Sequence, residues 1–149
     1  MERSSANALI SQTSFFGNDA FFLAISQNSA SLVFDQSTFI TNTATILSAE
    51  NVTMISITQN QFEDNVLYSS VIESNGSSSM IVTLNQFMNN SARFSILAAA
   101  NVTILSITHN QFDNNTLMFS GIEIYGPSSM ILTLNRFMNN TATLDMVFI

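Results

Sequence analysis

A phenylalanine that is followed three residues later by an asparagine occurs six times along the 149-residue chain, at steps of 24, 23, 25, 25 and 25 residues. A repeat of this length that fills the whole chain is typical of a solenoid, because each repeat forms one coil that buries its apolar side chains only by stacking on its neighbours. The repeated phenylalanines are Phe15, Phe39, Phe62, Phe87, Phe112 and Phe137, and the asparagines are Asn18, Asn42, Asn65, Asn90, Asn115 and Asn140.

Each repeat has the pattern of three short strands joined by corners. Apolar residues stand seven and five residues before most of the repeated phenylalanines, as in Ile55 and Ile57, and this period of two indicates a strand. Eleven residues before the phenylalanine stands Asn or Gly, the residue types that best tolerate the left-handed backbone of a tight corner. We therefore predict an all-β fold, a right-handed parallel β-helix of about six coils of 23–25 residues that forms a single domain over residues 1–149. The predicted corner residues are Asn28, Asn51, Gly76, Asn101 and Gly126.

The interior of such a solenoid consists of columns of equivalent residues. Successive coils stack at about 4.8 Å, the distance between neighbouring strands in a sheet. We therefore expect the six phenylalanines to form an internal stack and the six asparagines to form a hydrogen-bonded ladder. A second column of small, hydrogen-bonding residues stands two positions before the phenylalanines and comprises Thr13, Ser37, Asn60, Asn85, Asn110 and Asn135.

A longer period is superimposed on the first. Residues 51–99 align without a gap with residues 101–149 and are identical at 27 of 49 positions. The second half of the chain therefore looks like a duplication of a two-coil unit of 50 residues, at 51–100 and 101–149. One consequence is that alternate coils differ, with Glu63 and Asp113 in one kind of coil and Met88 and Met138 at the same place in the other.

The pattern N-x-F-x-x-N-x-A, present in Asn85–Ala92 and Asn135–Ala142, resembles the F-x-x-N repeats of the polymorphic outer membrane protein type. The resemblance covers all six repeats. Members of that family also carry a G-G-A-I-like tract in each coil, whereas this chain has Ser70-Val71-Ile72 and Ser120-Gly121-Ile122 in the corresponding places. The resemblance implies a right-handed β-helix that is extracellular or exposed at a cell surface, with an adhesive or structural role.

The net charge of the chain limits the classes of molecule that it can bind. The chain has 10 acidic residues, three arginines and no lysine, so its formal net charge is −7 at pH 7. A surface of this charge repels nucleic-acid phosphates and anionic lipids. The uncharged apolar runs at 20–25 and 94–100 are too short for a bilayer, which takes about 20 residues. We therefore expect neither a nucleic-acid partner nor membrane insertion, and the absence of cysteine excludes disulfides and thiol chemistry.

Two columns of carboxylates are the candidates for catalysis. Glu63 and Asp113 form one column and Glu73 and Glu123 the other, with two coils and therefore about 9.6 Å between the members of each pair. Glycoside hydrolysis uses two carboxyl groups about 5–10 Å apart on one face. However, the intervening coil supplies apolar residues, and no lysine or paired arginine stands nearby as a base. We interpret these residues, with Asp64, as solvated acids that keep the strand stack soluble.

No catalytic residue, cofactor or metal site is therefore predicted, and we do not expect an enzyme. His109 is the only histidine, and no metal-ligating residue shares its phase in the repeat. A carbohydrate-binding or carbohydrate-active β-helix remains the alternative, because β-helices often act on polysaccharides.

Six Asn-x-Ser/Thr sequons are candidate N-glycosylation sites if the chain enters a secretory pathway. Three lie at or near predicted corners, and three lie two residues after a repeated phenylalanine, where we expect the side chain to point outward. An equally weighted interpretation is that asparagine simply favours corners. The sequons begin at Asn51, Asn75, Asn89, Asn101, Asn114 and Asn139.

Two further groups of residues concern the surface. Thr58, Thr83, Thr108 and Thr133 form a column, but the column two positions earlier alternates Ser with Ile, so the double threonine array of an ice-binding face is not present. The chain also has more aromatic and large apolar residues than the interior columns require, and some of these should be exposed for contact with protein or sugar. They are Phe16, Phe21, Phe22, Tyr68, Phe94, Met118, Phe119 and Tyr125.

The expected function follows from the two ends of the predicted solenoid. Coil sequence starts by Leu9 and continues to the apolar residues 146–149, which leaves no space for the polar caps that solenoids use. An exposed strand edge invites pairing with another chain, and two different ends pair head to tail into a filament. We therefore expect a structural or adhesive module of an extracellular or cell-surface assembly. Its partners would be other copies, further coils of the same longer polypeptide, or glycans.

Overall fold

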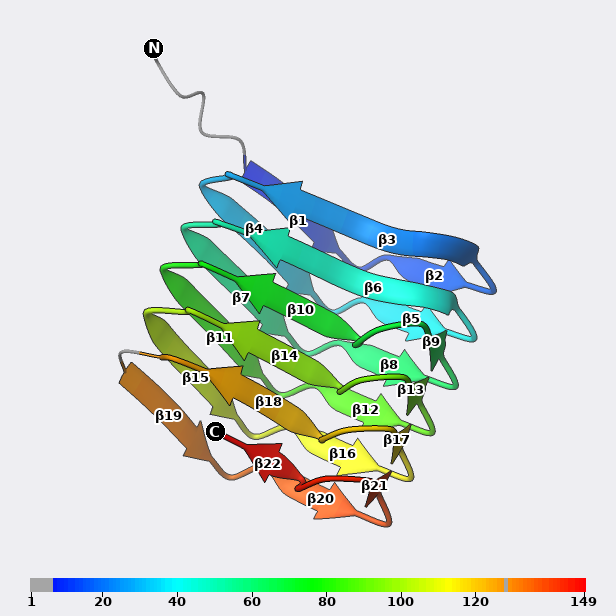
Figure 1. The fold of residues 1–149 in the computed structure, drawn as a ribbon. Helices are drawn as coiled ribbons and strands as arrows, with labels where there is room; N and C mark the ends of the chain where they lie inside the picture. Colours follow the sequence, from blue (N-terminus) through cyan, green and yellow to red (C-terminus); the bar gives the residue numbers. More distant parts are fainter. Residues whose placement is uncertain (1–6, 128) are drawn as a thin grey trace.

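The computed structural model describes residues 7–127 and 129–149, and within this part the side chains of residues 20–26 and 44 lie outside the description. The described residues form an all-β, parallel β-solenoid of about five turns (Figure 1). β1, β2 and β3 lie at one end of the stack, and β19, β20 and β22 lie at the other.

The described strands form three six-stranded sheets and one four-stranded sheet, and the strands of sheet A and of sheet B are of constant length. Every strand of sheet A has five residues and every strand of sheet B has three. Sheet A consists of β1 (Asn7–Ser11), β4 (Ser31–Asp35), β7 (Met54–Thr58), β11 (Ser79–Thr83), β15 (Ile104–Thr108) and β19 (Ser129–Thr133). Sheet B consists of β2 (Ser14–Phe16), β5 (Thr38–Ile40), β8 (Gln61–Glu63), β12 (Gln86–Met88), β16 (Gln111–Asp113) and β20 (Arg136–Met138).

The other two sheets change along the solenoid. Sheet C consists of β3 (Asp19–Gln27), β6 (Thr43–Glu50), β10 (Ile72–Asn75), β14 (Leu97–Ala100), β18 (Ile122–Tyr125) and β22 (Val147–Phe148). Sheet D consists of β9 (Val66–Leu67), β13 (Ser91–Ala92), β17 (Thr116–Leu117) and β21 (Thr141–Ala142).

The sequence pattern of three strands per coil therefore fits only the first two coils, in which β3 and β6 run unbroken (Figure 1). From β9 onward each coil divides this segment into a two-residue strand of sheet D and a strand of sheet C. The repeats differ in length in the same way, since the steps from Phe15 and Phe39 are 24 and 23 residues and the later steps are 25. The additional residues supply the bend between sheets C and D.

The register of the sheets aligns each repeat with the next. Phe39 pairs with Phe62, Phe62 with Phe87 and Phe87 with Phe112 in sheet B, all in parallel strands. Inward-facing residues of sheet A such as Ile55, Met80 and Leu105 are buried, whereas the alternate residues face outward. The inward residues of the sheets form one hydrophobic core cluster along the axis, as the period-two pattern predicted.

Corners are formed by residues in the left-handed backbone region, and the five predicted at Asn28, Asn51, Gly76, Asn101 and Gly126 all have positive φ, between 52° and 70°. Two further columns of left-handed residues were missed from the sequence. One stands three residues before the phenylalanines and comprises Gln12, Gln36, Gln59, Leu84, His109 and Leu134; the other stands two residues after them and comprises Gly17, Thr41, Asp64, Asn89, Asn114 and Asn139. Leucine, threonine and glutamine are not corner residues by type, so only their phase in the repeat reveals them.

Candidate functional site

The repeated phenylalanines form a continuous aromatic stack inside the solenoid. Neighbouring ring centroids lie 4.6–4.9 Å apart, with interplanar angles of 2–8°. The four central rings are buried, while Phe15 and Phe137 at the two ends are partly buried. The spacing equals the distance between strands, so the rings stack because the coils do.

The asparagines that follow form a ladder next to this stack. The side-chain oxygen Oδ1 of Asn90 accepts hydrogen bonds from the backbone N–H and the Nδ2 of Asn65, at 3.1 and 2.9 Å. The Nδ2 of Asn90 donates in turn to the carbonyl oxygen of Phe62, at 2.9 Å, and to Oδ1 of Asn115, at 3.1 Å. Each central amide therefore joins three consecutive coils and satisfies backbone groups that the corner would otherwise leave without partners.

A second ladder runs along the opposite end of sheet B. Asn60, Asn85 and Asn110 each donate from Nδ2 to Oδ1 of the next asparagine in the column, at 3.0–3.1 Å, and the last acceptor is Asn135. The sequence identified this column as hydrogen-bonding but gave it no ladder role. Ser37 continues it with its backbone N–H, which donates to Oδ1 of Asn60 at 2.9 Å.

Both ladders have a direction. In every ladder hydrogen bond to an Oδ1 atom, the donor belongs to the coil nearer the N-terminus and the acceptor to the next coil, from Asn18 and Asn42 through to Asn115 and Asn140. Within the described residues, Oδ1 of Asn18 accepts no hydrogen bond, and the backbone N–H of Asn140 has no partner. The Nδ2 of Asn140 donates only backward, to the carbonyl oxygen of Phe112 at 2.9 Å. One end of the ladder thus presents an acceptor and the other end presents donors.

The end surfaces also present core side chains. Ile10 and Phe15 at the first coil, and Leu132 and Phe137 at the last, are partly buried members of the core. Within the described residues, the outer edges of β1, β2 and β3 and of β19, β20, β21 and β22 pair with no further strand. Among the described residues, each end is therefore the cross-section of a coil whose outer strand edges have no partner.

The candidate carboxylates do not converge. Glu63 and Asp113 lie in register on either side of Met88, and Glu73 and Glu123 lie in register on either side of Ala98. Glu63 accepts a hydrogen bond from Gln61 at 2.7 Å, and Glu73 accepts hydrogen bonds from the hydroxyl of Ser69 and the backbone N–H of Ser70.

One oxygen of Asp113, Oδ1, is buried without a hydrogen-bond partner among the described residues. Asp64 and His109 are exposed corner residues, and no group of three or more metal-ligating side chains occurs in the part of the chain that the structure describes.

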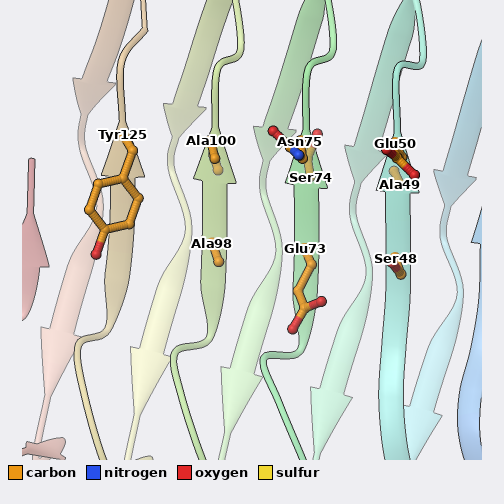
Figure 2. Close-up of a pocket in the computed structure, with 10 residues that line it drawn as sticks. Ser48, Ala49, Glu50, Glu73, Ser74, Asn75, Ala98, Ala100 and Tyr125 are labelled. Atoms are coloured by element: carbon orange, nitrogen blue, oxygen red, sulfur yellow. The ribbon is translucent and has the colours of Figure 1, made fainter.

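A shallow groove crosses the outer face of sheet C, with a volume of about 490 Å³ (Figure 2). Its floor includes Ala98 and Ala100 of β14, which leave a gap between the larger side chains on the neighbouring strands. Tyr125 lies on one side, and Glu73 and Asn75 lie on the other. No sequence motif marked this groove; it exists because one coil carries alanines where the coils beside it carry long side chains.

The sequon asparagines Asn51, Asn75, Asn89, Asn101, Asn114 and Asn139 are all exposed. They occupy two edges of the solenoid. Asn51 and Asn101 are left-handed corner residues, as are Asn89, Asn114 and Asn139. Asn75 is the last residue of β10 and accepts a hydrogen bond from Asn101 at 3.2 Å.

Several of the large apolar residues that the interior columns do not require are exposed. Phe16, Tyr68, Met118 and Tyr125 are at least half exposed. Phe94 and Phe119 are each 38% exposed and stack on each other with a centroid distance of 5.3 Å. The side chains of Phe21 and Phe22 lie outside the described residues.

These features define a parallel β-solenoid protein with internal phenylalanine and asparagine columns. No protein-family model and no curated protein matches the chain. In the described part of the chain no helix is long and apolar enough to cross a membrane.

Proposed function

We propose that this chain is a structural or adhesive β-solenoid module that stacks end to end in an extracellular or cell-surface assembly. The observation that carries the proposal is the direction of the asparagine ladder. Donors of Asn140 at one end match Oδ1 of Asn18 at the other, which accepts no hydrogen bond from the described residues, in the same way as Asn115 matches Asn140 inside the chain. A second copy placed in register would continue the ladder without a change of geometry.

The strand edges and the core support the same contact. A parallel strand edge has unpaired N–H and C=O groups, and another parallel coil satisfies them. The partly buried Phe137 would stack on Phe15 of the next copy, as the internal rings do. Because the two ends are different surfaces, the contact is head to tail and does not close, so it generates a filament.

The surface chemistry supports a location outside the cell. The six sequon asparagines are exposed, so their side chains are accessible to glycosylation in a secretory pathway. The phased F-x-x-N repeats resemble those of the polymorphic outer membrane protein type, and this resemblance implies surface exposure and an adhesive role. We propose no catalytic activity, because the register of sheet B places Met88 between Glu63 and Asp113.

Replacing Asn140 with aspartate tests the stacking. Aspartate keeps an acceptor for Asn115, but its side chain has no donor for Asn18 of the next copy or for the carbonyl oxygen of Phe112. The side-chain acceptors of residues 140 and 18 would then face each other, and only the backbone N–H of residue 140 would remain as a donor toward Asn18. We expect the protein concentration needed for assembly, measured by sedimentation velocity, to rise at least tenfold.

The matched control is Asn139→Asp, which adds the same charge at the neighbouring exposed corner, where an earlier coil already has Asp64. This control should assemble like the unmodified chain. Equal assembly of both variants, or a dispersed monomer of the unmodified chain at every concentration, would contradict the proposal. Circular dichroism of Asn140→Asp checks that the coils remain folded.

A second candidate function, carbohydrate binding, is favoured by the groove on sheet C. A sugar ring could lie on the alanine floor against the ring of Tyr125, with Glu73 and Asn75 as hydrogen-bonding groups. If a glycan array identifies a ligand, Tyr125→Ala should weaken its binding at least tenfold, whereas Tyr68→Ala on another face should not. Equal binding by the two variants would exclude the groove as the site.

A further inference from the structure

The outer face of sheet A from β7 to β19 carries no charged side chain, and all of its residues are described. The acidic side chains of this half of the chain lie elsewhere, with Glu63 and Asp113 on sheet B and Glu73 and Glu123 on sheet C. In a chain of net charge −7, two copies that approach through this face bring no like-charged side chains of these strands together.

Large and small side chains alternate on this face, both along each strand and from one strand to the next. The large residues are Met54, Ile81, Ile104 and Ile131, which are 41, 37, 53 and 54% exposed. The strand register places a serine beside each of them, at Ser79, Ser56, Ser129 and Ser106 respectively. The two-coil duplication produces this alternation, because equivalent positions in neighbouring coils carry different residues. The face is therefore a checkerboard of apolar projections and serine-lined hollows.

The checkerboard is complementary to itself. Consider a second copy related to the first by a two-fold axis that lies between the two facing sheets, parallel to the strands and midway between β11 and β15. This rotation reverses the order of the coils, so that β11 faces β15 and β7 faces β19, and each residue faces a residue at the same position along its strand. Under this operation Ile81 lies opposite Ser106 of the other copy, and Met54 lies opposite Ser129. Every projection then faces a hollow, and the threonine column faces itself, with Thr58 opposite Thr133. Two sheets packed face to face at about 10 Å interdigitate in this way.

We propose that two copies of this chain pair laterally and antiparallel through the outer face of sheet A. The four strands cover about 17 Å by 19 Å, or roughly 320 Å² per copy, which is well below the roughly 800 Å² per partner of a stable interface. A single pair is therefore weak. Pairing becomes strong when many copies in a stack engage together, so its strength rests on the proposed end-to-end assembly.

Single cysteines at Thr58 and Thr133 test the pairing, because the chain has no cysteine of its own. A short bismaleimide cross-linker should join Thr58→Cys to Thr133→Cys when the two variants are mixed, and neither variant alone should cross-link. In a pair, residue 58 of one copy lies three coils, or about 14 Å, from residue 58 of the other along the solenoid axis. The separation of the two sheets adds to this distance. Ala98→Cys on sheet C, mixed with either variant, is the control that should not react.

Two further variants test whether the pairing depends on the fit of the two faces or only on their hydrophobicity. Ile81→Glu should lower the mixed cross-linking at least tenfold, while Val66→Glu, which adds the same charge at an exposed apolar residue of sheet D, should leave it unchanged. Ser106→Ile fills a hollow and should also lower cross-linking, although it makes the face more apolar. An increase with Ser106→Ile, or cross-linking of Thr58→Cys with itself, would overturn the self-complementary pairing.

Electron microscopy of the same samples reports the stacking separately. Filaments without mixed cross-linking would overturn the lateral pairing and leave the stacking intact. Mixed cross-linking at millimolar protein without filaments would support the lateral pairing and contradict the stacking.

Discussion

Truncating Phe87 to alanine should lower the free energy of unfolding by about 3–5 kcal/mol, because the change removes a buried ring and leaves a cavity. Phe87 is fully buried, and its ring stacks on Phe62 at 4.8 Å and on Phe112 at 4.9 Å. The cavity would lie between two rings that are held apart by their own strands, so the coils cannot collapse to fill it. Urea unfolding followed by circular dichroism measures the effect.

Phe16→Ala is the control for this substitution. Phe16 follows Phe15 in β2, and its side chain is 73% exposed. Its truncation should change the free energy of unfolding by no more than about 0.5 kcal/mol. If both variants lose the same stability, the stack is not what holds the coils together.

Replacing Asn90 with alanine should cost about 3 kcal/mol or more. The side chain of Asn90 accepts a hydrogen bond from the backbone N–H of Asn65 and donates to the carbonyl oxygen of Phe62, and both groups would lose this partner. It also bonds to Nδ2 of Asn65 and Oδ1 of Asn115, which each keep one other hydrogen bond. Each buried polar group that loses its partner costs about 1–3 kcal/mol, and alanine offers no replacement. Thermal and urea unfolding both measure the loss.

The neighbouring residue supplies the matched control. Asn89 is exposed with φ of 54°, and the equivalent position of the first coil is Gly17, with φ of 64°. Asn89→Gly removes the same side chain from a backbone that glycine adopts freely. A change below about 1 kcal/mol is expected there, within the range of exposed sites. If Asn90→Ala lowers the free energy of unfolding no more than the control does, the hydrogen bonds of the ladder add no stability beyond the preference of asparagine for corners.

The sequence predicted the fold class because the solenoid repeats its solution in every coil. A phenylalanine and an asparagine at constant spacing can share one environment only if the coils stack in register, and the stack of Phe39, Phe62 and Phe87 has that register. The corners at Asn51 and Gly76 were predictable because their residue types tolerate positive φ.

Other features depend on position rather than residue type. Leu84 and Thr41 have φ of 58° and 53°, although neither residue favours this region. The stacked coils fix these backbone angles, so propensity gave no indication of them. The division of the later coils between sheets C and D was also missed, because one or two extra residues per repeat do not say where a bend falls.

The surface was the least predictable part. The groove of sheet C exists because Ala98 and Ala100 lie between longer residues on the adjacent strands. The checkerboard of sheet A exists because Ile81 is in register with Ser56 and Ser106. In both cases the feature is a relation between coils, and it becomes visible only when the register of the strands is known.

Cryo-electron microscopy of the purified 149-residue chain, at concentrations where sedimentation detects large species, tests the end-to-end assembly most directly. Six strands of sheet A per copy, at about 4.8 Å each, predict filaments with an axial rise of about 29 Å per copy and a strong 4.8 Å layer line. Asn140 of one copy should lie within hydrogen-bonding distance of Asn18 of the next. Dispersed monomers at every concentration, or filaments whose rise leaves a gap between the last coil and the first, would contradict the account.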